Sequence, residues 1–447
     1  MKRRQFLANL TLSAGALLAG SRCGSKERQG EPASGSGSGS GRTGDVIIEP
    51  ERRIPVLART DVLVVGGGPA GVAAAVAAGR AGADVVLVER YNHLGGLWTG
   101  GLVLPLLSTH AVDSEGEFQR VLYGIGGEIE GRLRDMGMII NEVNGVIDPE
   151  AGKYVLEIMI RDAGIRVLYH AWAGNVLITD NRIEAVMVET KSGRGAIVPK
   201  IVVDCSGDGD MLHLAGEDYE IMNYQVGLVH RLGNTDRIDS SRPGYKKLNI
   251  GKSTPVPGVN WVNMTTGVDE DGLDAWHLAE LQQQYRIDIW QTFDKIRSTP
   301  GYEKLFVLDT ASQLGVRMSR ILNGAHKLSQ QETMTHRSFT DVVGVSGAWT
   351  DILYRGRRVP WRTGRPMWQI PYRALLPQKT ENLLVAGRCF SFERALFEDA
   401  RIIATCLITG HAAGAAAALA ARHNTPVQRI DIERLQSLLR SQKANLG

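Results

Sequence analysis

The sequence predicts an α/β protein with a Rossmann-like domain, in which a parallel central sheet carries a small antiparallel insertion, and a second, α+β domain. The apolar run Val62 to Val65 is typical of a buried parallel strand. It leads into a Gly-x-Gly-x-x-Gly turn at residues 66–71 and then into the alanine-rich helical run 72–78. A second apolar run, 83–88, ends at Glu89. This order of strand, glycine turn, helix, strand and acidic residue is that of a dinucleotide-binding unit.

Each glycine of the turn has a separate predicted role. Gly66 permits the tight turn, Gly68 lets backbone N–H groups approach a pyrophosphate, and Gly71 lets the helix pack on the strand. The positive end of the helix dipole then faces the phosphates. Glu89 follows at the distance, about 20 positions, that suits an acidic residue on an adenosine ribose. We therefore expect a bound dinucleotide rather than a glycine turn without a ligand.

Composition sets broad limits on the fold and function. A chain of 447 residues with 43% hydrophobic residues is long enough for two domains with ample cores. Its 51 basic and 48 acidic residues nearly balance, and nucleic-acid binding is not predicted. No Cys-x-x-Cys pair occurs, so the usual iron–sulfur, zinc and redox-dithiol spacings are missing, and no metal site is predicted. We expect buried thiols in the folded part, where three of the four cysteines lie: Cys23, Cys205, Cys389 and Cys406.

Residues 1–24 have the pattern of a signal peptide. A basic start precedes an apolar stretch, Leu10 to Ala19, of about ten residues, which is too short to span a bilayer. The run Lys2-Arg3-Arg4-Gln5-Phe6-Leu7 resembles a twin-arginine export signal. We expect export by the twin-arginine machinery to the periplasm or cell surface, with a general secretory leader as the alternative. No transmembrane span is predicted.

A flexible Ser/Gly-rich linker is predicted for residues 25–53, so the folded body should begin near Ile54. Cys23 stands where a lipoprotein cysteine could be. Arg22 precedes it, although a lipobox has a small residue there, so a lipid anchor is the less favoured interpretation.

The loop after Glu89, residues 90–102, contains four glycines. A nicotinamide domain usually continues directly into its next helix, whereas backbone that passes close to an extended ligand such as FAD needs glycine. His93 in this loop could carry a covalent flavin, but a polar loop residue near cofactor or substrate is the favoured interpretation.

The middle of the chain is expected to contain two insertions into the nucleotide domain. A surface helix or two is predicted within 118–138, in a helical insertion at 111–149. The following strands form an antiparallel insertion that returns to the main sheet at Asp204; they are predicted at 165–169, 173–179, 182–190, 196–198 and 200–204. The turn that holds Asp208 and Asp210 then closes on the cofactor, which is favoured over a calcium loop because further ligands are missing.

A substrate or cap domain is predicted for residues 216–377. It has a helix candidate at 272–291, whose Trp276 and Trp290 are expected in the core. Arginines and aromatic residues gather near its end, where they either clamp an anionic or sugar-like substrate or form a solvated face over packed rings. Both interpretations stay open for this set: Arg355, Arg357, Arg358, Trp361, Arg362, Arg365, Trp368, Tyr372 and Arg373.

The last block returns to the nucleotide domain with a strand, the turn Gly387-Arg388, and a helix rich in glycine and alanine around Gly410 and Gly414. Small side chains let this helix lie against another backbone or a flat ring, and its dipole would favour the negative charge of a reduced flavin. The FAD-binding domain is thus expected to comprise residues 54–110, 150–215 and 378–425, with a C-terminal helix in 426–447.

With these blocks in place, the chain resembles the FAD-dependent oxidoreductases of the glutathione-reductase-type, two-dinucleotide-binding-domain flavoprotein superfamily. Within it, the chain is most similar to the single-nucleotide-domain group that supplies the flavin module of heterodisulfide reductase. The similarity covers about residues 59–423, and its motifs lie in order at 65–71, 94–101, 204–210, 315–320, 370–373 and 382–414. The iron–sulfur clusters of that group are not transferred, because the cysteines for them are missing.

The resemblance implies FAD as cofactor and a set of binding residues. These are Gly66, Gly68, Pro69, Ala70, Gly71, Glu89, Gly95, Gly96, Gly387 and Arg388. From their places in the loops and the last helix, we add Arg90, Asp208 and Gly410. Arg317 and Arg320 match a family pair near flavin or substrate, with Met318 where an acidic residue is common, and Arg373 is added as a substrate-orienting residue.

The function expected from the sequence is an exported flavoenzyme. An organic small molecule passes a hydride to flavin N5, and the acceptor is not a nicotinamide, since no second Gly-x-Gly-x-x-Gly unit is evident. A flavin-containing carbohydrate lyase or isomerase and a non-catalytic flavin-binding protein are the alternatives. Residue type alone offers four candidate bases, which the sequence cannot rank: His110, His230, His326 and His336.

Overall fold

The computed structural model describes residues 49–112, 118–347, 352–354, 357–359 and 367–447. Residues 54–447 form one compact unit, and the segment before them is a separate unit. The predicted signal peptide, Cys23 and nearly all of the linker lie outside the described residues. The predicted division into a FAD-binding and a cap domain stays a prediction.

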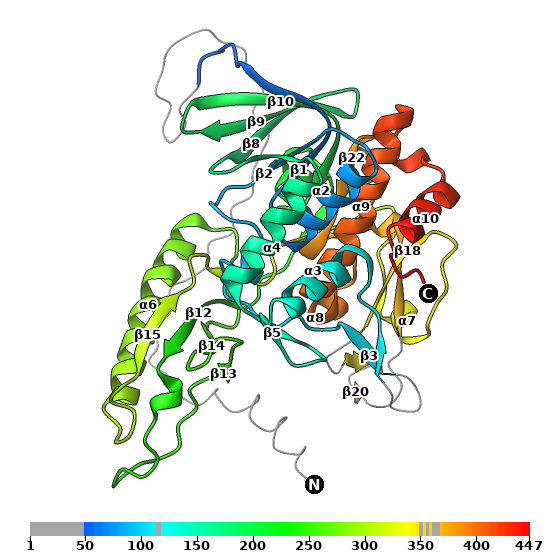
Figure 1. The fold of residues 1–447 in the computed structure, drawn as a ribbon. Helices are drawn as coiled ribbons and strands as arrows, with labels where there is room; N and C mark the ends of the chain where they lie inside the picture. Colours follow the sequence, from blue (N-terminus) through cyan, green and yellow to red (C-terminus); the bar gives the residue numbers. More distant parts are fainter. Residues whose placement is uncertain (1–48, 113–117, 348–351, 355–356, 360–366) are drawn as a thin grey trace. The chain divides into compact units, whose positions relative to one another are not determined.

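The central sheet has seven strands in the order β7-β2-β1-β10-β9-β8, with β22 paired to β10 (Figure 1). Val65 lies opposite both Val88 and Asp204, and Asp204 lies opposite Val385. The carboxyl ends of these strands therefore meet at one edge, which confirms the predicted parallel sheet. The parallel strands are β1 (Val56–Val65), β2 (Val85–Val88), β7 (Arg166–Leu168), β10 (Gly193–Asp204) and β22 (Leu383–Val385).

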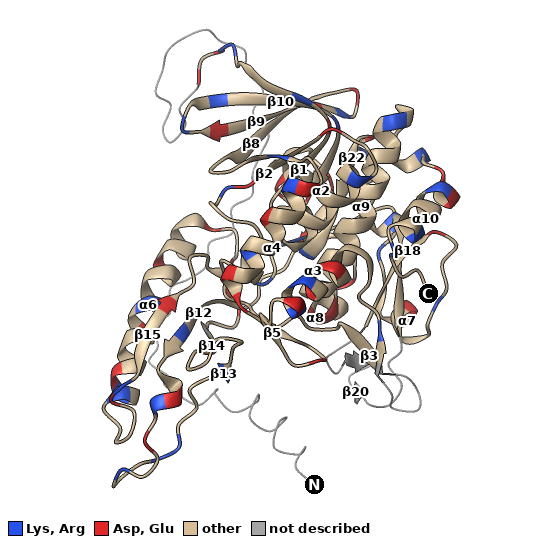
Figure 2. Ribbon diagram, in the orientation of Figure 1, with Lys and Arg blue, Asp and Glu red and all other residues tan. Residues whose placement is uncertain are grey.

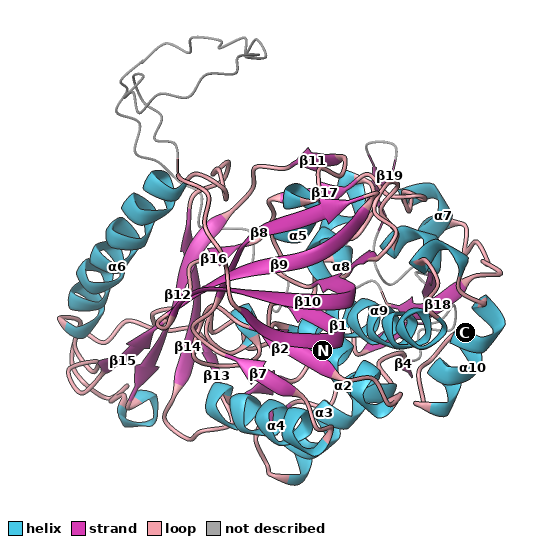
Figure 3. Cartoon of the chain, turned by 90° about the horizontal axis from the view of Figure 1, so that it is seen from above, coloured by secondary structure: helices cyan, strands magenta, loops and turns pink. Residues whose placement is uncertain are grey.

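The two faces of this sheet pack against different elements because strand side chains alternate. Val62 and Val64 join the core cluster of helices α2 (Pro69–Arg80) and α9 (Ile403–His423), which lie side by side. Leu63 belongs to the opposite cluster with residues of the β8–β9 hairpin. Figure 3 shows β10, β1, β2 and β7 as neighbours in one sheet. By length and composition α9 could cross a membrane, but its burial identifies it as a core helix.

The predicted antiparallel insertion is present as β8 (Trp172–Thr179), β9 (Arg182–Thr190) and the first half of β10. One detail differs, because 196–198 and 200–204 belong to a single strand. Pairing of β10 with β9 ends at Ile197. The sheet therefore needs no hydrogen bond on that side from Pro199, which lacks a backbone N–H.

The described residues of the insertion at 111–149 contain one helix, α3 (Gly124–Asp135), which is shorter than the predicted helical stretch 118–138. Helix α4 (Pro149–Asp162) follows, with proline in its first turn. The Asp148 side chain caps it by accepting the Ala151 N–H at 2.9 Å. Short strand pairs make up the rest: β3 (His110–Val112), β4 (Phe118–Arg120), β5 (Ile139–Ile140) and β6 (Val146–Ile147).

A second sheet, of order β13-β14-β12-β15 with β16 on β12, packs against the long helix α6 (Ala275–Arg297). The prediction that Trp276 and Trp290 belong to the core is wrong, because they are 83% and 48% exposed. The buried stripe of α6 is Tyr285, Ile289 and Phe293, at spacing i, i+4, i+8. Trp276 lies on the opposite face, nine residues before Tyr285. The strands are β12 (Val226–Gly233), β13 (Lys252–Ser253), β14 (Asn260–Thr266), β15 (Phe306–Thr310) and β16 (Gly315–Val316).

Shorter elements complete the described part of the chain. Helix α10 falls within the predicted C-terminal helix, and acidic and basic residues are interspersed along it and along α6 (Figure 2). The helices are α5 (Asp210–Leu214), α7 (Gln330–Met334), α8 (Phe397–Ala400) and α10 (Ile432–Ser441). The 3₁₀ turns are η1 (Gly96–Trp98), η2 (Thr235–Arg237), η3 (Tyr372–Leu375), η4 (Gly387–Cys389), η5 (Arg394–Leu396) and η6 (Val427–Arg429). The strands are β11 (Tyr219–Ile221), β17 (Arg320–Leu322), β18 (Val342–Ser346), β19 (Ile352–Tyr354), β20 (Arg357–Val359) and β21 (Trp368–Pro371).

Candidate functional site

Four loops leave the carboxyl edge of the central sheet and pack on one another. They follow β1, β2, β10 and β22, at residues 66–71, 89–101, 205–210 and 386–389. A Cβ on Gly66 would overlap the carbonyl oxygen of Cys205 in the third loop. A Cβ on Gly96 would lie 3.1 Å from Gly68 Cα, and one on Gly387 would lie 3.0 Å from Ala70 Cβ. The predicted cofactor glycines therefore come together at the edge where open α/β sheets bind ligands.

In the glycine turn, the fold itself requires glycine at positions 66 and 71 but not at position 68. Gly66 has φ +99°, and a Cβ on Gly71 would overlap the carbonyl oxygen of Gly66, so backbone geometry requires both. Gly68 has φ −69°, and a Cβ there would meet no atom within 4 Å. The space beside Gly68 is the space that a pyrophosphate needs, so the turn fits a bound dinucleotide.

Helix α2 begins in this open space. Its N-cap residue, Gly68, makes no side-chain capping hydrogen bond, and Pro69 and Ala70 form the first turn. Free backbone N–H groups and the helix dipole at this end suit an anion. The buried Glu89 carboxylate accepts the Gly67 N–H at 2.6 Å and the Tyr91 N–H at 2.8 Å, one on each oxygen. Each oxygen has a further lone pair that can accept a ribose hydroxyl.

The glycine loop after Glu89 is held in a conformation that favours glycine. Gly95 and Gly96 have φ values of +97° and +50°. The His93 ring is buried inside the loop, with Nε2 3.3 Å from Nε2 of Gln313 and Nδ1 3.3 Å from the Leu94 oxygen. Burial lowers the pKa of His93. His93 is thus a packed polar residue of the loop, as favoured from the sequence, while its distance to cofactor or substrate stays a prediction.

Asp208 holds two arginines at the third loop. It lies 2.9 Å from Arg388 Nη2 and 3.5 Å from Arg90 Nη2, and it accepts the Ser319 hydroxyl at 2.9 Å. Burial opposes ionisation, but the two arginines outweigh it, and the pKa of Asp208 is lowered. The structure brings these three predicted cofactor residues together.

Arg320 is a partner of the same loop. It donates to the Asp208 carbonyl oxygen at 2.9 Å and lies 3.3 Å from Asp210 Oδ1. Burial, together with the neighbouring carboxylates of Asp208 and Asp204, raises the pKa of Asp210 to about 6. Met318 carries no charge, and the ion-pair partner of Arg320 comes from the Asp210 turn instead.

Arg373 is removed from these loops and has its own partner. Its Nε lies 2.9 Å from Asp341 Oδ2, and its side chain is 49% exposed. Trp368 and Tyr372 are buried, which supports packed aromatic residues rather than a substrate clamp at these two positions. The other members of the arginine-rich stretch leave both interpretations open, because they lie outside the described residues or in β20, whose side chains are not described: Arg355, Arg357, Arg358, Trp361, Arg362 and Arg365.

Helix packing accounts for Gly410, which we predicted as a cofactor contact. A Cβ on Gly410 would overlap the carbonyl oxygen of Ala70, and one on Gly414 that of Ala74. The two glycines let α9 lie against the backbone of α2, the first of the two options that the sequence offered. Contact of Gly410 with cofactor is not needed to explain this residue.

The four candidate histidine bases come from different places in the chain: His110 begins β3, His230 lies in β12, and His326 and His336 flank α7. His326 pairs with Glu332, with Nε2 3.1 Å from Oε2, and His110 contacts Thr109. His230 is buried in β12, and burial lowers its pKa to about 4. None of the hydrogen bonds or ion pairs among the described residues joins a candidate histidine to the Asp208 loop.

The sequence pointed to Arg317, but sequence reasoning missed the cluster that Tyr224, Glu398 and Arg401 form near it. Tyr224 donates its hydroxyl to Glu398 Oε1 at 3.0 Å, and Arg401 pairs with Glu398 Oε2. Three chain segments contribute to this cluster, and no local motif links them. Its sequence signals are Arg317 in the 315–320 motif and Arg401 beside the start of the last glycine-rich helix.

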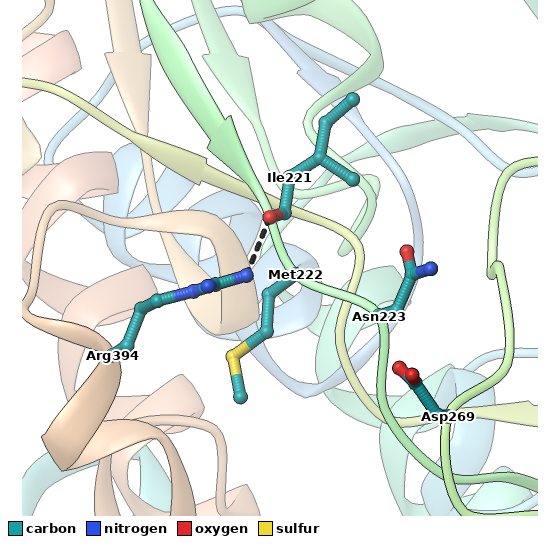
Figure 4. Close-up of a pocket in the computed structure, with 5 residues that line it drawn as sticks. All are labelled: Ile221, Met222, Asn223, Asp269 and Arg394. Carbon is teal, nitrogen blue, oxygen red and sulfur yellow. Dashed lines mark hydrogen bonds between the residues drawn. The ribbon is translucent and has the colours of Figure 1, made fainter. Parts of the chain in front are cut away.

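A polar pocket lies beside this cluster, with a volume of about 470 Å³ (Figure 4). Arg394 donates to the Ile221 carbonyl oxygen at 2.7 Å, and the side chains of Asn223 and Asp269 lie across from it. Its lining comes from three segments: residues 221–223, which lead into Tyr224, Arg394, which lies four residues before Glu398, and Asp269.

The parallel sheet and the four packed loops define a dinucleotide-binding α/β protein. Residues 61–228 and 229–439 match the family described as FAD dependent oxidoreductase, so the chain belongs to that family. The protein is an FAD-dependent oxidoreductase, and FAD is its cofactor. The assigned loops fit the dinucleotide of FAD, and the individual contact residues remain predictions.

The chain is also similar to several known proteins. Thiamine thiazole synthase of Aeropyrum pernix is 32% identical over 142 residues, which make up 31% of this chain and 46% of that protein, so less than half of that protein is covered. A geranylgeranyl bacteriochlorophyll reductase-like structure from Thermoplasma acidophilum has a TM-score of 0.44 at 14% identity, with 86% of this chain and 84% of that chain covered. A p-nitrophenol 4-monooxygenase from Pseudomonas putida has a TM-score of 0.42 at 11% identity, with 86% and 88% covered.

Proposed function

We propose that the protein is an exported oxidoreductase whose FAD accepts a hydride at N5 from an organic small molecule, sugar-like or anionic. The electrons then leave to an acceptor other than a nicotinamide nucleotide. Of the chain's own residues, the glycine turn, Glu89 and the Asp208–Arg388 pair would hold the cofactor. The relationship to the flavin module of heterodisulfide reductase remains part of this proposal.

The state of the described cysteines carries the proposal that the acceptor is external. Cys205, Cys389 and Cys406 are free and buried. Burial raises the pKa of Cys406 to about 12 and raises those of Cys205 and Cys389 well above the ordinary thiol value. A thiolate is the reactive form of cysteine, so these residues are poor partners for electron exchange with a flavin. The sequence also contains no second Gly-x-Gly-x-x-Gly strand–turn–helix unit.

Two features support an electron-accepting flavin with an organic substrate. The Gly387 N–H donates to Thr409 Oγ1 at 3.1 Å, which ties the first turns of α9 to the fourth loop. The positive end of α9 at this edge would favour negative charge on a reduced flavin. The pocket of Asn223, Asp269 and Arg394 offers the amide and carboxylate groups that bind hydroxylated molecules.

Export is proposed from the sequence of residues 1–24, with the twin-arginine machinery as partner. Such machinery carries folded proteins, which suits a chain that must bind FAD before it leaves the cytoplasm. Fractionation of producing cells tests this point, with Arg3 and Arg4 changed to lysine as the variant. Retention of the variant in the cytoplasm is expected, while unchanged export would contradict the twin-arginine route.

An anaerobic substrate screen on the purified holoprotein tests the reaction. Sugars and hydroxy acids are mixed with the protein, and loss of the flavin absorbance band is followed. Bleaching by one of them, reversed by a quinone and not by NAD, is the expected result. Product formation without bleaching and without an acceptor would instead identify a lyase or isomerase.

A further inference from the structure

Arg317 differs from the other described arginines of the site, because its guanidinium has no hydrogen-bond or ion-pair partner among the described residues. It follows β16, and its own N–H is bonded to the Gln225 carbonyl oxygen at 3.3 Å. Its side chain is partly buried, and burial, followed by the nearby Arg401, lowers the pKa of Arg317. Removing a cation even partly from water without a partner is unfavourable, and a ligand of opposite charge would offset that cost.

Glu398 is the described carboxylate whose charge acts on Arg317, and it is already engaged. Glu398 accepts the Tyr224 hydroxyl on Oε1 and pairs with Arg401 on Oε2. The cluster of Arg317, Arg401 and Glu398 therefore carries two positive charges and one negative charge. Nε of Arg401 is buried and has no hydrogen-bond partner within the described part of the chain. Two guanidinium groups thus have unused donors at one place.

This place adjoins the cofactor loops. The residue before Arg317, Val316, accepts a hydrogen bond from Arg388, which in turn pairs with Asp208. Arg401 precedes α9, whose Thr409 binds the fourth loop. Val316 thus connects Arg317 to Arg388, a residue assigned to FAD, and the cluster lies on the side of the second sheet. Two of the three segments that line the polar pocket of Figure 4 lead into Tyr224 and Glu398.

We propose that Arg317, with Arg401 beside it, binds the anionic group of the substrate, and that the substrate is a small organic acid with a carboxylate or phosphate. This inference rests on the proposed oxidoreductase function and specifies its substrate class. Guanidinium groups bind such oxyanions by charge-assisted, often bidentate hydrogen bonds. Arg317 is a binding residue in this proposal, and Glu398 with Tyr224 positions Arg401.

Anion binding to the holoprotein tests the proposal without any need for turnover. Acetate, succinate and inorganic phosphate are titrated at constant ionic strength, with acetamide and succinamide as neutral counterparts. Flavin difference spectra and the melting temperature report binding. We expect saturable binding of at least one anion and none of its neutral counterpart. Arg317→Met should weaken that binding about 10- to 100-fold, and Arg317→Lys should weaken it less.

Arg297→Gln is the matched control, since Arg297 lies at the end of α6 in an exposed ion pair with Asp294 and should leave anion binding unchanged. FAD content and melting temperature show whether each variant is folded. The inference is overturned if no anion binds saturably to the wild-type protein, or if a folded Arg317→Met binds anions as the wild type does.

The two proposals fail in different ways. If anion binding depends on Arg317 but no compound bleaches the flavin, the anion site stands and the hydride-transfer proposal is lost. If a neutral compound bleaches the flavin equally in wild type and Arg317→Met, the oxidoreductase proposal stands and the anionic substrate is wrong.

Discussion

The arginines of the site differ mainly in which carboxylate neutralises their charge. Arg388 and Arg320 take their partners from the Asp208 loop, which lies more than 100 positions away in the sequence. Arg373 takes Asp341, and Arg317 has no partner among the described residues. The sequence pointed to all four arginines, but it could not distinguish them, because the distinction depends on carboxylates that the fold brings from elsewhere.

Replacing Gly68 by alanine is predicted to weaken FAD binding, whereas replacing Gly71 by alanine is predicted to destabilise the fold. Gly68→Ala keeps an allowed φ and meets open space, so the apoprotein should be as stable as wild type or slightly more stable. Its Cβ enters the space assigned to the pyrophosphate, and FAD affinity should fall by about 1–3 kcal/mol. Gly71→Ala should destabilise the apoprotein itself, since its Cβ would overlap the Gly66 carbonyl. Urea unfolding and FAD titration separate these effects. Unchanged FAD affinity of Gly68→Ala or Gly68→Asp would place the pyrophosphate elsewhere.

Asp208 and Asp210 are predicted to affect stability with opposite sign. The folded pKa of Asp210, about 6, lies above its unfolded value of 3.8, so the folded state binds the extra proton between these values. The stability that proton binding at Asp210 gives to the folded state is therefore lost as the pH rises from about 4 to about 6. Asp210→Asn should then stabilise the protein at pH 8, by about 1–3 kcal/mol, and have little effect near pH 4.

Asp208→Asn is the opposite case, because the folded pKa of Asp208 is lowered. Its stabilisation is present above the unfolded value and lost as the pH falls through the folded one. The substitution should destabilise the protein at pH 8, since Arg388 and Arg90 lose their counter-charge. Urea midpoints of both variants at pH 4 and pH 8 are the measurement, and shifts of the same sign at pH 8 would contradict this account.

At the scale of elements, the sequence predicted the parts whose signals are local. The glycine turn, the β8–β9 hairpin and the parallel strands follow from short patterns that the structure confirms. Helix α6 shows the limit, because Trp276 and Trp290 are large and apolar yet lie off the buried Tyr285–Ile289–Phe293 stripe. Which face of a helix is buried depends on the sheet that packs on it, and the sequence of the helix alone does not contain that sheet.

The contact between α2 and α9 gives a prediction at this scale. A Cβ on Gly414 would overlap the Ala74 carbonyl, so Gly414→Ala must move the helices apart and should destabilise the protein by about 1–3 kcal/mol. Gly131 lies inside α3, and a Cβ there would meet no atom within 4 Å. Gly131→Ala should therefore stabilise the protein by about 0.5–1 kcal/mol. Thermal unfolding of both variants is the test, and equal shifts would show that helix propensity, not close packing, governs Gly414.

The described chain joins two sheets to one cofactor edge, and its described cysteines form no disulfide that could relay electrons from the flavin. The loop after β2 is tied to the second-sheet segment, because Ser312 and Gln313 both donate their N–H groups to the Gly100 carbonyl oxygen. Arg317, which has no partner in the described ranges, lies just beyond this segment. The described thiols are buried within the core instead of facing one another at the surface. Electron transfer in the holoprotein should therefore involve FAD alone.

Reductive titration tests this expectation on the complete holoprotein. Dithionite should be consumed at two electrons per FAD, because a flavin takes two electrons and no disulfide is available among the described residues to take two more.

In parallel, iodoacetamide at pH 8 should leave Cys205, Cys389 and Cys406 unmodified in the folded protein and modify all three in urea, since burial suppresses their thiolates. Mass spectrometry of the peptides gives the extent of labelling, and Cys23, if it remains in the purified chain, serves as the internal positive control. A four-electron titration, or rapid labelling of Cys205 or Cys389 in the native state, would require a thiol relay and would refute an external acceptor as the sole exit for electrons.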